Sequence, residues 1–394
     1  MKKILVFVVA LIVVFTLAAC TTGGGATDNG GATTDNSGGG AATTDTGNGA
    51  ATTTGVNYAT DVGIVLPTNA ESRWPAAEVQ FNKSMPGATV LYSNGDTAVE
   101  KTNVESLIAK GVKYIIICSQ DGTVASSSID AAKAAGITTI AYDRLIMDTA
   151  NLDYYVTFDS VAVGAAQGQY LADQATGTGN NLYLYAGALS DNNSFLFFQG
   201  AWSVLQPKIA DGTFNIVNSS EATALKDQAE LSHDDMSKII GQITTNWDAS
   251  VAKTLAESNL GAASAAQKGT AFVLAPNDDC SRAITDAFRN DSAVTQIYST
   301  GQDFTQASLQ YILDGKQSMT IFKSDALLVA ACLDIVNSVA AGTTPTSIVT
   351  TYNNLAADIP ATKCDLATVT KDNIADIVSG SGLFQISNGQ VAPL

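Results

Sequence analysis

Polar and charged side chains follow several apolar runs of this 394-residue sequence, at the point where each run ends. The runs are short and rich in β-branched residues, as is typical of buried strands. Their polar continuations are residues 68–74, Asp143-Arg144, Asp191-Asn192-Asn193, Asn277-Asp278-Asp279, Gln302-Asp303 and Lys323. Because ligands of open α/β sheets bind at the carboxyl ends of the strands, we expect these side chains to meet in one site.

The residue types in these positions indicate a ligand with many hydroxyl groups. Carboxylates accept hydrogen bonds, arginine and lysine donate them, and asparagine does both. Two of the three tryptophans, Trp74 and Trp247, adjoin polar residues and suit the C–H face of a sugar ring. A plainer interpretation stays open for each residue: Asp143-Arg144 as a surface pair, the tryptophans as core residues, and Asp191, Asp278 or Asp279 as helix caps.

The composition excludes several other kinds of site. Lys+Arg 20 against Asp+Glu 37 gives a formal charge of −17, which argues against a nucleic-acid partner. The sequence has no glycine-rich phosphate loop after a strand and no alternating Asp/Asn calcium loop. Its single histidine, His233, is predicted to be an exposed loop residue, so a histidine-based metal site or catalytic triad is not expected. We therefore expect neither a cofactor nor a metal ion.

The N-terminal segment has the features of an export signal. Lys2 and Lys3 precede an apolar stretch that ends at Ala19-Cys20, so residues 1–19 are predicted to be a signal peptide. Small residues before Cys20 resemble the bacterial lipoprotein box, which implies lipidation of Cys20; an ordinary signal with an incidental cysteine is the alternative. Residues 20–55 are expected to form a flexible tether, because they are almost entirely small or polar. These features predict an extracytoplasmic protein anchored to the bacterial membrane by lipid.

The rest of the chain alternates apolar strands with alanine-rich helices. Strands are predicted at 62–67, 89–93, 114–119, 138–143, 154–159, 182–187, 214–218, 271–276, 296–301 and 318–323. Helices are predicted at 99–110, 126–135, 161–175 and 325–341, three of them followed by a glycine. This alternation predicts an α/β fold with two doubly wound parallel sheets, and a closed barrel of eight units is the main competitor.

The cysteines after Cys20 match no zinc or redox spacing. Cys118 ends an apolar run and is expected to be a small buried residue. Cys332 and Cys364 could pair in an oxidising compartment or remain free thiols, and the sequence leaves both possibilities open.

From about Tyr58 onward, the chain resembles the type I periplasmic sugar-binding proteins of ABC transporters, and most closely the xylose-binding and multiple-sugar-binding groups. The pieces that carry the resemblance are Arg73-Trp74, Tyr142-Asp143-Arg144, Asp191-Asn192-Asn193, Asn246-Trp247-Asp248, Pro276-Asn277-Asp278, Gly301-Gln302-Asp303 and Phe322-Lys323. The acidic or amide residue that the family has shortly before the Arg-Trp pair corresponds to Glu71 or Asn69. The resemblance supports the prediction of two α/β domains.

The resemblance implies that the two domains close on a monosaccharide around a three-strand hinge. The first domain would comprise residues 58–158 and 324–355, and the second residues 159–323 and 356–394. The ligand contacts that the family implies are Arg73, Trp74, Asp143, Arg144, Asp191, Asn193, Trp247, Asn277, Asp303 and Lys323. Trp74 and Trp247 would pack on opposite sides of the ring, and Asp303 and Lys323 would lie near the hinge.

The function expected from these features is capture of a pentose or hexose and its delivery to an ABC permease, by a monomer without enzymatic activity. A secreted carbohydrate-active enzyme is one alternative, with Asp143, Asp278 and Asp303 as candidate acids and bases. Arg144 beside Asp143 and Lys323 near Asp303 oppose this, because cations keep carboxylates ionised. A receptor for a sugar-like signal or for chemotaxis is the other alternative. A sugar-responsive repressor is disfavoured, because such a protein would begin with a basic helix-turn-helix.

Overall fold

The computed structural model describes residues 55–394 of the chain. The predicted signal peptide, the lipidation site at Cys20 and nearly all of the tether lie outside this range. Residues 55–394 belong to one compact unit. Within residues 55–394, none of the helices combines the length and the apolar character needed to cross a bilayer.

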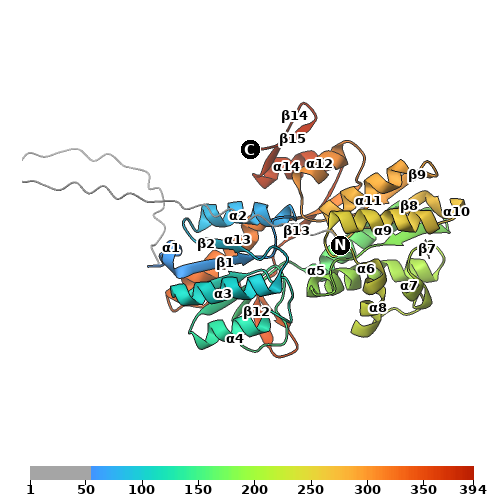
Figure 1. Ribbon diagram of the computed structural model, residues 1–394. Coiled ribbons are helices and arrows are strands. Elements are labelled where there is room, and N and C mark those ends of the chain that lie inside the picture. The colour runs from blue at the N-terminus through green and yellow to red at the C-terminus, as the bar shows by residue number, and fades with distance from the viewer. Residues whose placement is uncertain (1–54) are drawn as a thin grey trace, which may run out of the picture. The chain divides into compact units, whose positions relative to one another are not determined.

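The first part of the fold is an open seven-stranded sheet (Figure 1). Its strands are β1 (Val62–Leu66), β2 (Thr89–Tyr92), β3 (Tyr114–Ile117), β4 (Thr138–Tyr142), β5 (Tyr154–Val156), β11 (Thr350–Asn353) and β12 (Asp358–Ala361). The strand order is β11-β12-β5-β4-β3-β1-β2, and every neighbouring pair is parallel except β11 and β12. Two free edges exclude the closed barrel.

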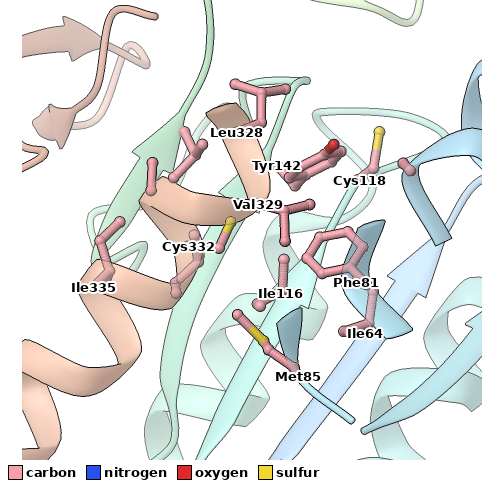
Figure 2. Close-up of a cluster of buried hydrophobic side chains, with 14 of the residues drawn as sticks. Ile64, Phe81, Met85, Ile116, Cys118, Tyr142, Leu328, Val329, Cys332 and Ile335 are labelled. Carbon is pink, nitrogen blue, oxygen red and sulfur yellow. The ribbon is translucent and has the colours of Figure 1, made fainter. Parts of the chain in front are cut away.

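Helices cover both faces of this sheet, because alternate strand residues point to opposite sides. The helices are α1 (Tyr58–Asp61), α2 (Arg73–Ser84), α3 (Thr97–Lys110), α4 (Ser126–Ala134) and α13 (Asp325–Ala340). Ile64, Ile116 and Tyr142 pack with α2 and α13 (Figure 2). Their neighbours Val65 and Ile117 pack on the other face with α3 and α4. We call this sheet and its helices the first lobe.

A four-stranded parallel sheet forms the centre of the second lobe. Its strands are β6 (Asn180–Leu184), β7 (Phe214–Ile216), β8 (Gly269–Leu274) and β9 (Val294–Ser299), in the order β7-β6-β8-β9. The helices around it are α5 (Ser160–Gln174), α6 (Asn192–Ala210), α7 (Ser220–Ala224), α8 (His233–Ile243), α9 (Ala249–Ala262), α10 (Ala265–Lys268) and α11 (Asp278–Asn290). His233 is exposed, as expected, but it begins α8 rather than lying in a loop, because Ser232 caps that helix.

The second lobe also contains a small C-terminal layer. It consists of β10 (Met319–Lys323), β13 (Leu366–Thr370), α12 (Gln306–Leu313), α14 (Ile374–Ser381), β14 (Phe384–Ser387) and β15 (Gln390–Pro393). The predicted strand at 318–323 is present, but β10 pairs antiparallel with β13 instead of extending the four-stranded sheet. Phe304, Ile312 and Val391 belong to the apolar cluster that holds this layer together.

Three segments connect the lobes: residues 157–159 between β5 and α5, residue 324 between β10 and α13, and residues 362–365 between β12 and β13. The sequence predicts that the first domain ends at residue 355, whereas the strand pairing extends its sheet further. β12 pairs with β11 and β5, so the chain stays in the first sheet as far as Ala361. The chain passes to the second lobe only after the β11–β12 hairpin, because the antiparallel strand β12 adds one more strand to the first sheet.

The four described cysteines are free thiols. Cys118 is fully buried, as predicted, together with Cys280 and Cys332, whereas Cys364 is half-buried. The Cys332–Cys364 bond that the sequence left open is therefore not formed in this structure.

Candidate ligand-binding site

All ten predicted ligand residues line a single cavity between the two lobes. The first lobe supplies Arg73 and Trp74 at the start of α2 and Asp143 and Arg144 after β4. The second lobe supplies Asn193 from the first turn of α6. Its other residues come from the loops after β6, β8 and β9, from the loop before α9 and from the end of β10: Asp191, Asn277, Asp303, Trp247 and Lys323. The strand ends of both sheets therefore meet at one place.

Three further residues line the cavity, namely Glu71, Phe197 and Gln302. Glu71 corresponds to the acidic position considered before the Arg-Trp pair, and Gln302 lies beside Asp303. Phe197 is in the middle of α6, where its sequence neighbours Phe195 and Phe198 belong to the core. An apolar residue in an apolar helix carries no sequence signal that separates a ligand contact from packing.

Arg73 is the centre of one network of buried charges. Its Nη2 lies 2.6 Å from Asp143 Oδ2 and 3.3 Å from Asp325 Oδ1, and its Nη1 lies 3.6 Å from Asp303 Oδ1. Lys323 Nζ lies 3.1 Å from the same Asp303 oxygen. Asp303 therefore joins a guanidinium of the first lobe to an ammonium of the second.

Arg144 is the centre of a separate network. Its Nε lies 3.0 Å from Asp191 Oδ2 and its Nη2 lies 3.5 Å from Glu71 Oε2. Arg144 also donates to the Ser119 carbonyl at 3.2 Å. Asp143 and Arg144 are thus not an ion pair with each other, although the charge of Arg144 helps to keep Asp143 ionised, as expected. Asp143 has a left-handed backbone, with φ of 64°, and its principal partner is Arg73, 70 residues away.

The charges of the cavity are nearly balanced. Burial raises the pKa of Asp143, but the charges of Arg73, Lys323 and Arg144 outweigh it and leave that pKa below its usual value. Burial raises the pKa of Glu71 to about 7, although Arg144 opposes the shift. Three cations thus face four lining carboxylates, one of which is only partly ionised at neutral pH. Such a site suits an uncharged ligand, because an ionic ligand would bring an uncompensated charge into a buried space.

The two tryptophans lie in the cavity wall and are also buried, so the core and ligand interpretations are compatible. The guanidinium carbons of Arg144 and Arg73 lie 5.0 and 5.5 Å from the centre of the Trp74 ring, within range of cation–π attraction. Trp247 meets Phe197 edge-on at 6.3 Å between ring centres. Its indole lies so close to Gly187 that a Cβ there would be 2.0 Å from a ring carbon.

The helix-cap interpretations are also partly correct. Asp191 caps α6 by accepting from the Asn193 N–H at 2.9 Å while it pairs with Arg144. Asn277, rather than Asp278 or Asp279, caps α11 by accepting from the Cys280 N–H. The Asn193 side chain donates to the Asp143 carbonyl at 2.9 Å, which is a direct bond between the lobes.

Several buried polar atoms of the cavity have no hydrogen-bond partner among the described residues, including Arg73 Nε, Trp247 Nε1 and Gln302 Oε1. Buried donors and acceptors are nearly always paired in folded proteins. Unpaired atoms around one cavity therefore indicate a ligand that supplies both donors and acceptors. In the part of the chain that the structure describes, no group of three or more histidine, cysteine, aspartate or glutamate residues is arranged to hold a metal ion.

Two α/β lobes with a buried polar cavity between their strand ends define a solute receptor. Residues 62–344 match the family model of the periplasmic binding protein domain, and the chain belongs to that family. This confirms the resemblance and the two-sheet α/β fold that the sequence predicts. The family assignment also places the protein outside the cytoplasm.

Known proteins with similar sequences and structures support the assignment. The multiple sugar-binding periplasmic receptor ChvE of Rhizobium radiobacter is 32% identical over 337 residues, which cover 82% of this chain and 90% of the receptor. A carbohydrate transporter solute-binding protein from Chloroflexus aurantiacus, solved in complex with D-glucose, has a TM-score of 0.80 and 55% identity, over 82% of this chain and 95% of that one. A solute-binding protein from Clostridium phytofermentans with bound β-D-glucose has a TM-score of 0.72 and 26% identity, over 81% and 97% of the two chains. These relatives are described as binding proteins rather than enzymes.

Proposed function

We propose that this protein captures a monosaccharide in the cavity between its lobes and delivers it, unaltered, to an ABC permease. The observation that carries the proposal is the cavity between the lobes, where cations and carboxylates nearly balance and the wall contains unpaired donors and acceptors. A neutral sugar supplies both kinds of group on one small ring. D-Glucose is the first sugar to test, because the relative with 55% identity was solved with it.

Each kind of side chain has a separate task in this proposal. Asp143 and Asp303 accept hydrogen bonds from sugar hydroxyls, and Arg73, Arg144 and Lys323 donate to them. Asn193 and Asn277 do both, and Asp191 holds Arg144 in place. The indoles of Trp74 and Trp247 cover apolar C–H groups. Asp143, held ionised by Arg73, has no proton to give to a glycosidic oxygen, which favours binding over hydrolysis.

Capture requires that the lobes open and close. The structure contains direct bonds between the lobes, including Asn193 to Asp143 and Arg144 to Asp191. We propose that residues 157–159, 324 and 362–365 form the hinge, so that sugar binding shifts the population towards the closed form. The two lobes would then comprise residues 55–156 with 325–361, and residues 160–323 with 366–394.

Lipidation of Cys20 would keep the receptor close to the permease. The support is the sequence pattern around Cys20 and the tether that follows it. One diacyl or triacyl modification anchors a protein to the surface without crossing the bilayer.

A panel of monosaccharides tests the proposal on the fragment 56–394, which contains all the apolar clusters described above. A sugar present at about 100 times its Kd stabilises the fold by about 2.7 kcal/mol, which a thermal-shift assay detects readily. We expect D-glucose, D-xylose or D-galactose to raise the melting temperature, and calorimetry to give one site per chain. No stabilisation by any sugar, or turnover of an aryl glycoside, would contradict the proposal.

A further inference from the structure

The helix N-termini of the two lobes meet at the rim of the cavity. The Ser72 N–H, immediately before α2, donates to Asp279 Oδ2 at 2.9 Å. The Ser72 hydroxyl donates to Asp279 Oδ1 at 3.0 Å. One residue belongs to the first lobe and the other to the second, and neither lines the cavity. Both oxygens of one carboxylate therefore hold the lobes together without touching the ligand space.

The Ser72 side chain bonds to the other lobe and does not cap its own helix. It occupies the N-cap position of α2, where a serine side chain usually accepts a hydrogen bond from the first turn. Within the described chain the Ser72 side chain makes no such capping bond. Its hydroxyl donates to Asp279, so this side chain serves the contact between the lobes.

Asp279 is held in position by its own lobe. Asn277 already caps α11, which leaves the Asp279 carboxylate free to face α2. Arg282, one turn along α11, contacts Asp279 through its Nη2. Its Nη1 donates to Thr305 Oγ1 at 2.8 Å and to Ser308 Oγ at 2.7 Å. The carboxylate thus also has a partner within its own lobe.

We propose that the Ser72–Asp279 pair is a latch that sets how much of the protein is closed, and so sets its affinity for every sugar. The inference rests on the proposed function. A carboxylate is favoured at the N-terminus of a helix, so closure brings Asp279 to a favourable position at α2. Because the apparent Kd scales inversely with the closed fraction, loss of the latch weakens all sugars by one common factor.

Three single variants of the protein test the latch by calorimetry and stopped-flow binding with D-glucose and D-xylose. Asp279→Ala removes both bonds to Ser72, and with them the contact to Arg282, and should raise Kd about 10-fold for each sugar, mainly through faster release. Ser72→Ala keeps the N–H bond and should have a smaller effect. Asp286→Ala is the matched control, because Asp286 is also on α11 but bonds to Tyr311 of its own lobe; its affinity should not change.

The outcomes separate the latch from the proposed function. If the parent protein binds no sugar of the panel, the proposed function fails and the latch fails with it. If the parent binds and Asp279→Ala binds equally well, the latch alone is refuted. A loss that differs between the two sugars also refutes it, because a sugar-specific loss indicates direct ligand contact. An unchanged melting temperature of the unliganded Asp279→Ala protein, together with a common loss, supports the latch over general destabilisation.

Discussion

Replacing Gly187 by alanine tests how Trp247 is held against the cavity. The new Cβ would lie 2.0, 2.3 and 2.4 Å from three carbons of the indole, distances at which the ring must move. Gly187 has no left-handed backbone, so alanine itself fits the local conformation. Displacing an aromatic ring from a stacked ligand costs about 1–3 kcal/mol, by analogy with base stacking. We therefore expect Kd for the sugar to rise about 5- to 150-fold in calorimetry.

A double-mutant cycle assigns this loss to Trp247. Trp247→Ala alone should weaken binding by a similar amount, and adding Gly187→Ala to it should change little, because the ring that clashes is gone. Gly261→Ala is the matched control, since no described atom lies within 4 Å of a Cβ placed there. Unaltered affinity in Gly187→Ala, or an equal further loss in the Trp247→Ala background, would refute the reasoning.

Three other predictions concern buried or partly buried groups. Asp303→Ala removes the carboxylate that pairs with buried Lys323, whereas Arg73 keeps Asp143 and Asp325, so binding or folding should lose about 3–5 kcal/mol through Lys323. Calorimetry and urea unfolding measure the loss, and a neutral result would contradict the network. Burial raises the pKa of Glu100 to about 7 from 4.5, although the Gln120 N–H bond opposes it. Because the pKa of Glu100 is higher in the folded state, its contribution to the free energy of unfolding is fully present below pH 4.5. This contribution, about 3 kcal/mol in all, is lost as the pH rises through 7. The melting temperature of Glu100→Gln should therefore fall less steeply with pH than that of the parent protein. Phe384→Ala removes a ring whose centre lies 6.0 Å from that of Phe304, the residue next to Asp303 in the sequence. Urea unfolding should show a loss of about 1–3 kcal/mol in the free energy of unfolding. The control Gln385→Ala, at an exposed neighbouring position, should show no loss.

The sequence predicts the strands and most of the candidate site because both depend on the types and order of neighbouring residues. An apolar β-branched run such as 114–119 forms a strand wherever it is buried, and the polar residue at its end lies at the sheet edge. Asp143, Asp303 and Lys323 are predicted from that position together with the family resemblance, and the structure brings them to one cavity.

Other features have no local signal. β12 extends the first sheet because it pairs with β11 and β5, and β10 leaves the second sheet because it pairs with β13, although all these segments look alike as short runs. Phe197 lines the cavity although it lies in an apolar helix like any core residue. Strand partners and the direction of a helix face are decided by contacts between distant parts of the chain.

The sequence by itself determined the alternating α/β pattern, the residue types of the site and their place at strand ends. Only the tertiary structure decided that Arg73 pairs with Asp143, that Arg144 pairs with Asp191, and that Ser72 reaches Asp279 across the rim. The physical reason is that hydrogen-bond propensity and hydrophobic periodicity act over a few residues, whereas Coulomb attraction and burial depend on distances in space. The raised pKa of Glu71 and the unpaired atoms of the cavity arise only once the chain has folded around them.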